Sequence, residues 1–75
     1  MKKIINLNES IYDIYNKNPE IADIMYEYGF HDIVRPGMIQ TAGRIMTIPK
    51  GAAMKKLDIE EIKKDLISRG YEVQE

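Results

Sequence analysis

The chain has 75 residues, of which 44% are hydrophobic, 11 are Lys or Arg, 12 are Asp or Glu and none is cysteine. This length suits a single domain with a small core, so we expect one domain over residues 1–75. The lack of cysteine excludes disulfides, the single histidine leaves almost no means of holding zinc, and a charge near zero in both halves lacks the positive excess that nucleic-acid binding requires.

The amino-terminal segment MKKIINLNES contains two lysines and only a short apolar run, which Asn6 interrupts. That run is too short for the core of a signal peptide or for a membrane span, so we expect a cytoplasmic protein with no membrane contact. Residues 3–7 and 71–74 alternate between apolar and polar side chains. They predict two short strands at the ends of the chain, and these strands could pair.

A first helix is predicted to begin near residues 8–10. Ser10 and Asp13 have the spacing of a capping box, although Asn8 could cap the helix instead. The helix must end before Pro19, because the proline ring pushes the preceding residue out of helical geometry. Its apolar stripe consists of Ile11, Ile14 and Tyr15.

A second helix follows, with Pro19 suited to its first turn. Its apolar residues recur at helical spacing and are Ile21, Ile24, Met25 and Tyr28. Gly29 predicts a left-handed residue that ends the helix, after which Phe30 can fold back on Met25.

Residues 31–46 show neither helical nor strand periodicity, although residues 38–46 are apolar enough to be buried and could hold a short helical turn. Thr47 is expected to cap a short third helix, and Asp58 is expected to cap a fourth that ends at Gly70. Ile59, Ile62 and Leu66 form the inner face of that last helix. The predicted fold is mainly α: a small bundle of about four short helices around an irregular central segment, with short terminal strands.

The last two helices resemble a helix-turn-helix, a motif that binds DNA through its second helix. That helix begins with acidic residues where a recognition helix would enter the groove, and its lysines are balanced by acids. We therefore expect no nucleic-acid partner. The charged face is better explained by ion pairs along the helix, for example between Glu60 and Lys64.

The order of these motifs resembles a small bacterial and archaeal domain of unknown function, which occurs alone or ahead of PAS and hemerythrin-like regulatory modules. The family pattern is a Pro-Glu that opens a helix, Gly-Phe, a Pro-x-Met turn, Thr-x-x-Arg, a threonine followed by Ala-Ala, and a final acidic helix start. The resemblance spans roughly residues 5 to 70. The matching positions here are Pro19, Glu20, Gly29, Phe30, Pro36, Met38, Thr41, Arg44, Thr47, Ala52, Ala53, Asp58, Glu60 and Glu61.

That family is similar to two others, the redox-disulfide domain associated with hybrid cluster proteins and the amino-terminal domain of iron–sulfur repair proteins. In those relatives cysteines follow the Gly-Phe position, whereas this chain has His31 and Asp32 there. Thiol redox chemistry therefore does not carry over, because it needs a thiolate. Iron binding belongs to the neighbouring hemerythrin-like module and does not carry over either, so we expect no cofactor and no metal.

Two groups of side chains are candidates for a site. Arg44, Thr41, Arg35 and His31 could hold an anion, since guanidinium groups and hydroxyls bind phosphate and carboxylate. Alternatively, Arg44 could cap a helix or pair with Asp32, and His31 could be an ordinary loop residue. The second group is apolar and could fill the core or form a surface covered by another subunit. Its members are Met38, Ile39, Ile45, Met46, Ile48 and Met54, of which the first five are the predicted interface.

Two hypotheses of function follow. The first is a non-enzymatic interaction or regulatory module that forms a homodimer or docks on a partner protein through the apolar centre. The second is a sensor of a small ligand or anion built on the four polar candidates. The sequence contains no recognised catalytic constellation, so we expect no enzymatic activity.

Overall fold

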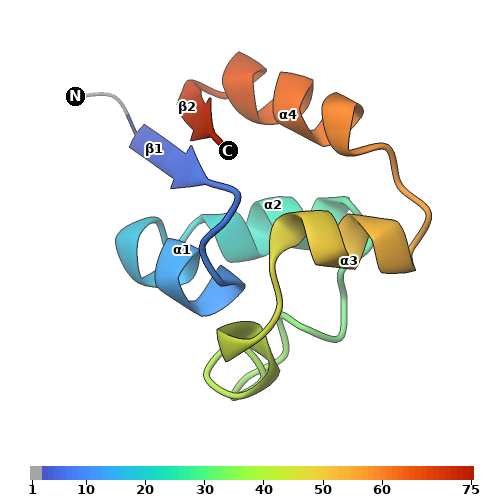
Figure 1. Ribbon diagram of the computed structural model, residues 1–75. Coiled ribbons are helices and arrows are strands. Elements are labelled where there is room, and N and C mark those ends of the chain that lie inside the picture. The colour runs from blue at the N-terminus through green and yellow to red at the C-terminus, as the bar shows by residue number, and fades with distance from the viewer. Residues whose placement is uncertain (1–2) are drawn as a thin grey trace.

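The structure is a computed structural model that describes residues 3–75. Within that range the chain forms four α-helices, one short 3-10 helix and two strands (Figure 1). In chain order these are β1 (Lys3–Asn6), α1 (Ile11–Lys17), α2 (Ile21–Glu27), η1 (Ala42–Arg44), α3 (Ile48–Met54), α4 (Ile59–Ser68) and β2 (Tyr71–Gln74). The mainly helical fold with an irregular centre and short terminal strands is confirmed.

Local hydrogen bonds explain where α1 begins and ends. The Ser10 hydroxyl accepts the backbone N–H of Asp13 at 3.1 Å, so Ser10 and not Asn8 is the cap. Asn18 has φ −136° and ψ 81°, outside the helical region, as expected for the residue before Pro19.

Gly29 ends α2 as predicted. Its φ of +100° lies in the region that favours glycine, and the N–H of Phe30 then reaches back to the carbonyl of Met25 at 3.0 Å. Gly70 has φ +99° and follows the end of α4, where its own N–H donates to the carbonyl of Ile67 at 3.0 Å. Both aromatic residues that follow these glycines, Phe30 and Tyr71, are buried in the core.

The end of α3 has the same hydrogen bonds without a glycine. Thr47 caps the start of this helix, as predicted, by accepting the N–H of Lys50 at 3.2 Å. At the other end Lys56 has φ +58°, and the N–H of Leu57 donates to the carbonyl of Ala52 at 2.8 Å. Lys56 therefore holds a left-handed conformation that costs a residue with a Cβ atom about 1 kcal/mol or more.

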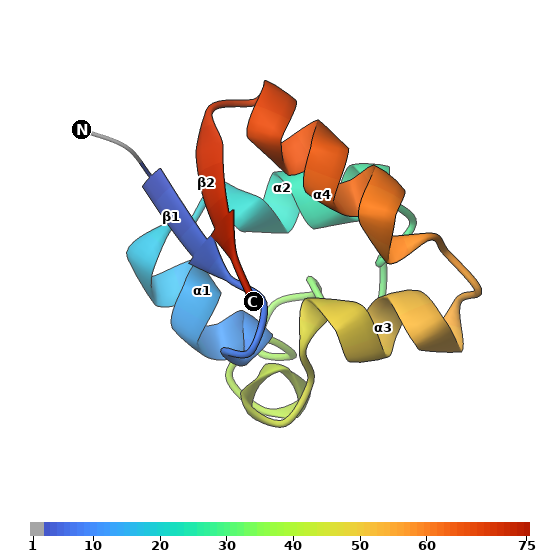
Figure 2. The same cartoon turned by 45° about the horizontal axis from the view of Figure 1, so that its top comes forward.

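The two strands pair in parallel, with Lys3 opposite Tyr71 and Asn6 opposite Gln74. Figure 2 shows them side by side, with α4 next to β2. The outer edge of β1 is partly closed by Asn18, a buried polar residue whose side-chain amide donates to the carbonyl of Ile4 at 3.2 Å. This bond anchors the turn between α1 and α2 to the sheet.

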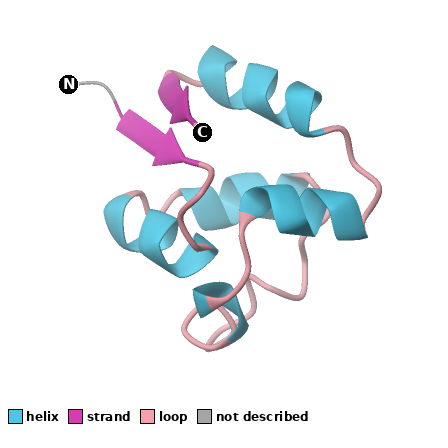
Figure 3. Ribbon diagram, in the orientation of Figure 1, coloured by secondary structure: helices cyan, strands magenta, loops and turns pink. Residues whose placement is uncertain are grey.

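The core draws side chains from both strands and all four α-helices. In Figure 3 the strands and α4 lie at one end of the molecule and the loop that contains η1 lies at the other, with α1, α2 and α3 between them. The side chains that are almost fully buried in this core are Ile5, Ile11, Ile14, Ile21, Met25, Ile48 and Leu66.

Polar contacts connect α2 to the carboxyl-terminal elements. The Tyr28 hydroxyl donates to Asp65, and Arg69 donates to Asp65 at 2.7 Å and to Glu27 at 3.2 Å. Burial, together with the bond to Asp65, raises the pKa of Tyr28 well above its usual value. These bonds hold the end of α2 against α4.

A second polar cluster joins both strands to α2. Glu20 accepts hydrogen bonds from Lys3 at 2.9 Å and from the Tyr71 hydroxyl at 2.8 Å. Both bonds favour the ionised carboxylate, so the pKa of Glu20 falls from 4.5 to about 2, and Lys3 makes the largest contribution.

The ion pairs along α4 differ in detail from the predicted i, i+4 pattern. Glu60 pairs with Lys63 at 2.8 Å, three residues on, and Lys64 lies 3.9 Å from Glu61. The prediction of a Glu60–Lys64 pair is wrong. Lys63 pairs with both Glu60 and Glu75, the residue that follows β2, so the ammonium group of Lys63 takes the place predicted for Lys64.

Candidate functional site

The surface between the irregular loop and α3 contains an apolar hollow of about 390 Å³, which we call the methionine groove. One wall comes from the loop after α2 and the other from the last turns of α3. Its lining is predominantly apolar. The residues that line it are Phe30, Asp32, Ile33, Met38, Ala42, Met46, Gly51, Met54 and Lys55.

Phe30 is positioned by the ending of α2 and by Gly51. Its side chain is buried, and a Cβ atom added at Gly51 would lie 2.8 Å from Cε1 of the phenyl ring. No real Cβ atom approaches that closely, so glycine at position 51 makes room for the ring. The Nζ atom of Lys55 lies 5.9 Å from the ring centroid, within the range of a cation–π contact.

The predicted apolar interface residues divide between this surface and the core. Met38 and the half-buried Met46 line the groove, and Ile45 is 78% exposed. Ile39 and Ile48, by contrast, are buried inside the protein. Their place in the interface set is corrected, because a side chain enclosed by its own domain offers no surface to a partner.

Met54 belongs to the same apolar centre of the chain but not to the five residues predicted for the interface. It is 73% exposed and lines the groove together with Gly51 and Lys55. Met54 and Lys55 lie three and four positions after Gly51, so helical periodicity could have placed both beside it on one face.

Two of the polar candidates stabilise the loop itself. The guanidinium group of Arg44 lies over the ring of Tyr12, 4.1 Å from its centroid, and its Nε atom donates to the carbonyl of Gln40 at 2.7 Å. The hydroxyl of Thr41 donates to the carbonyl of Gly37 at 3.0 Å. Arg44 therefore neither caps a helix nor pairs with Asp32.

The other two polar candidates lie together in a different hollow of about 330 Å³, next to α2. The ring of His31 stacks on Tyr26, with 4.2 Å between the centroids, and Arg35 pairs with Asp32 at 3.5 Å. Neither Thr41 nor Arg44 lines this hollow. The structure thus separates the four residues into two pairs.

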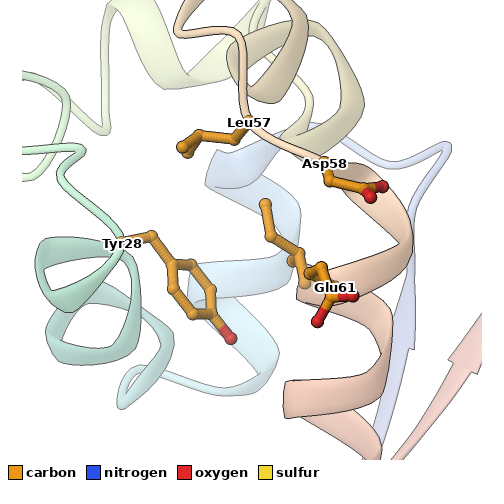
Figure 4. A pocket seen from close by; sticks show the side chains of 5 residues that line it. Tyr28, Leu57, Asp58 and Glu61 are labelled. Atoms are coloured by element: carbon orange, nitrogen blue, oxygen red, sulfur yellow. The ribbon is translucent and has the colours of Figure 1, made fainter.

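Figure 4 shows another hollow, of about 260 Å³, between the end of α2 and the start of α4. Tyr28, Leu57, Asp58 and Glu61 surround it. Its polar groups already have partners: Tyr28 donates to Asp65, and Asp58 caps α4 by accepting an N–H at 2.9 Å. The bond from Tyr28 joins the two helices, and the bond to Asp58 caps α4 locally.

Two broader observations concern the described part of the chain. Residues 3–75 contain no group of three or more His, Cys, Asp or Glu side chains placed to hold a metal ion. In the same range no helix is long and apolar enough to cross a membrane.

The chain belongs to the family described as "Domain of unknown function (DUF1858)", whose family model matches residues 5–63. It is also similar to a solved structure, "the conserved domain protein from Streptococcus pneumoniae TIGR4", with 30% sequence identity and a TM-score of 0.88. That match covers 97% of this chain and 92% of the other. A search of curated proteins found no match. The predicted membership of a small domain family of unknown function is confirmed.

Proposed function

We propose that this member of the DUF1858 family is a non-enzymatic interaction module whose methionine groove binds an apolar segment of a partner protein. The observation that carries the proposal is a concave apolar surface with Phe30 as its floor and the exposed Met54 at its rim. Methionine side chains are flexible and polarisable, and they are common on surfaces that accept partner helices. Met38 and Met46 complete this lining.

The size of the groove favours a peptide segment over a second copy of the chain. A stable interface buries about 800 Å² on each partner. For a protein with a total accessible surface of 4830 Å², that is roughly a sixth of the molecule. A hollow of about 390 Å³ accepts the side chains of one short segment and covers much less than that area. The occupant that we propose is therefore a partner segment and not a second copy of the chain, the other alternative given by the sequence.

An anion sensor built on Arg44, Thr41, Arg35 and His31 is less well supported. Arg44 and Thr41 already bond to the loop, and they do not line the hollow that contains the other two residues. An anion would have to break the stacking of Arg44 on Tyr12 to recruit all four.

The proposed relation to redox-disulfide and iron–sulfur repair domains bears on the class of partner. In that proposed relation, His31 and Asp32 take the positions of the relatives' cysteines. We propose that this chain shares their association with regulatory or redox proteins in the cytoplasm and contributes a docking surface rather than a thiol.

The experiment titrates the ¹⁵N-labelled protein with a short helical peptide that carries Leu and Phe on one face and Gln elsewhere. We expect amide chemical-shift changes in residues 30–46 and in α3, and at least tenfold weaker binding by Met54→Glu. The matched control is Ile67→Glu, which changes another exposed apolar residue (59%) that lies on α4 and outside the groove.

Absence of shift changes at millimolar peptide would overturn the proposal, and so would equal losses in the two variants. Light scattering tests the alternative of self-association. A dimer that Met54→Glu abolishes would assign the groove to a second copy of the chain.

A further inference from the structure

The net charge of the chain is near zero, but its basic and acidic side chains are distributed unevenly along the sequence. Residues 30–57 contain five basic side chains and one acidic one, which is a net charge of +4. The rest of the chain contains six basic and eleven acidic side chains, a net charge of −5. The positive segment includes all the residues that line the methionine groove.

The basic side chains inside residues 30–57 also differ from those outside in how many of them form ion pairs. Outside residues 30–57, every basic side chain that the structure describes has a carboxylate partner; these residues are Lys3, Lys17, Lys63, Lys64 and Arg69. Within residues 30–57, Arg35 alone has one, in Asp32. The other four basic side chains of this segment have no carboxylate of residues 3–75 within 4.0 Å. They are Arg44, Lys50, Lys55 and Lys56.

Among these unpaired cations Lys55 lines the groove, and Lys50 and Lys56 lie near it in the sequence. Lys50 lies one helical turn before the rim residue Met54. Lys56 follows at the end of the helix, and all three lysines are exposed. The acid in the lining, Asp32, is already paired with Arg35, so it does not neutralise them.

We infer that the occupant of the methionine groove is an acidic amphipathic segment of a partner protein, with apolar anchors beside Asp or Glu side chains. This inference rests on the proposed function and adds the charge of the partner. Apolar side chains would enter the hollow above Phe30, and carboxylates would face Lys55 and the nearby unpaired lysines Lys50 and Lys56. Complementary charge of this kind speeds association and selects among partners with similar apolar anchors.

An anionic membrane surface would also attract exposed lysines beside apolar residues. The shape of the groove favours a protein segment, because the apolar lining is concave and Phe30 at its floor is only 4% exposed. Individual side chains can enter such a hollow, whereas a flat bilayer cannot follow it.

The test compares three helical peptides with the same Leu and Phe face and with Glu, Gln or Lys at the remaining positions. Isothermal titration at low salt should give the tightest binding for the Glu peptide, about tenfold tighter than the Gln peptide, as expected for a few exposed ion pairs. The Lys peptide should bind weakest. The advantage of Glu over Gln should shrink as salt rises toward about 0.5 M, because the Debye length falls well below 10 Å.

The decisive variant is the double substitution Lys50→Gln and Lys55→Gln, which should remove most of the preference for Glu over Gln. The matched control is Lys17→Gln with Lys64→Gln, two exposed lysines outside the groove. That control should keep the preference. Because all four lysines are exposed, none of these changes disturbs the core.

The outcomes separate this inference from the proposed function. Equal affinity for the Glu and Gln peptides would overturn the acidic-partner inference while leaving the groove as a docking site. Failure of all three peptides to bind would overturn both. Binding to phosphatidylserine vesicles without any peptide preference would assign the lysines to a membrane. Self-association that is lost with Lys50→Gln and Lys55→Gln would assign the groove to the acidic surface of a second copy.

Discussion

The substitution Lys56→Gly should stabilise the protein, although it removes a side chain from the surface. Lys56 has φ +58°, a conformation that costs an L-residue about 1–2 kcal/mol and costs glycine nothing. Glycine also lowers stability by about 0.5–1 kcal/mol, because it gives the unfolded chain more conformational freedom. The net gain is therefore about 0.5–1 kcal/mol in the free energy of unfolding, which raises the Tm of a domain of this size by about 3–6 °C.

Thermal and urea unfolding followed by circular dichroism measure this gain directly. Lys55→Gly is the matched control, because Lys55 is adjacent and exposed but has φ −96°. It should lower stability, since glycine there adds only unfolded-state entropy. If Lys56→Gly were neutral or destabilising, or if the two variants had the same effect, the reasoning would be refuted. The left-handed backbone conformation of Lys56 would then not lower the stability of the protein.

Three further predictions concern the cap, the groove floor and acid stability. Ser10→Ala should cost about 1 kcal/mol in urea unfolding while Asn8→Ala costs almost nothing; the reverse result would move the cap. Phe30→Ala should cost about 3 kcal/mol, and a loss below 1 kcal/mol would contradict the tight contact with the core. The bond from Lys3 lowers the pKa of Glu20 to about 2, so this carboxylate stabilises the fold fully above pH 4.5 and progressively less down to pH 2. With its side chain 36% exposed, Glu20→Gln should cost less than about 1 kcal/mol at pH 7, and that difference should disappear near pH 2.

Local signals in the sequence account for most of the secondary structure. The proline at position 19 ended α1, the glycines at 29 and 70 ended α2 and α4, and Thr47 and Asp58 capped α3 and α4 as expected. These features depend on the backbone geometry of one residue and its near neighbours, so they can be recognised without knowledge of the fold.

Other features depend on contacts between distant residues. Asn18 looked like a simple boundary before a proline, yet its buried amide bonds to β1. The parallel direction of the strands, and the separation of Arg44 from His31, follow from how the helices pack around the irregular loop. No periodicity in residues 31–46 could have indicated this arrangement.

For the candidate site, the sequence by itself determined which residue types are available: methionines and isoleucines in the centre of the chain, and lysines with few acids among residues 30–57. Tertiary structure alone decided which of them form a surface. Ile39 and Ile48 lie in the core, whereas Met54 is exposed at the rim of the groove, because burial depends on what the rest of the chain places against each side chain. The same packing set Lys55 beside an apolar hollow, away from the carboxylates that pair with the described basic side chains outside residues 30–57.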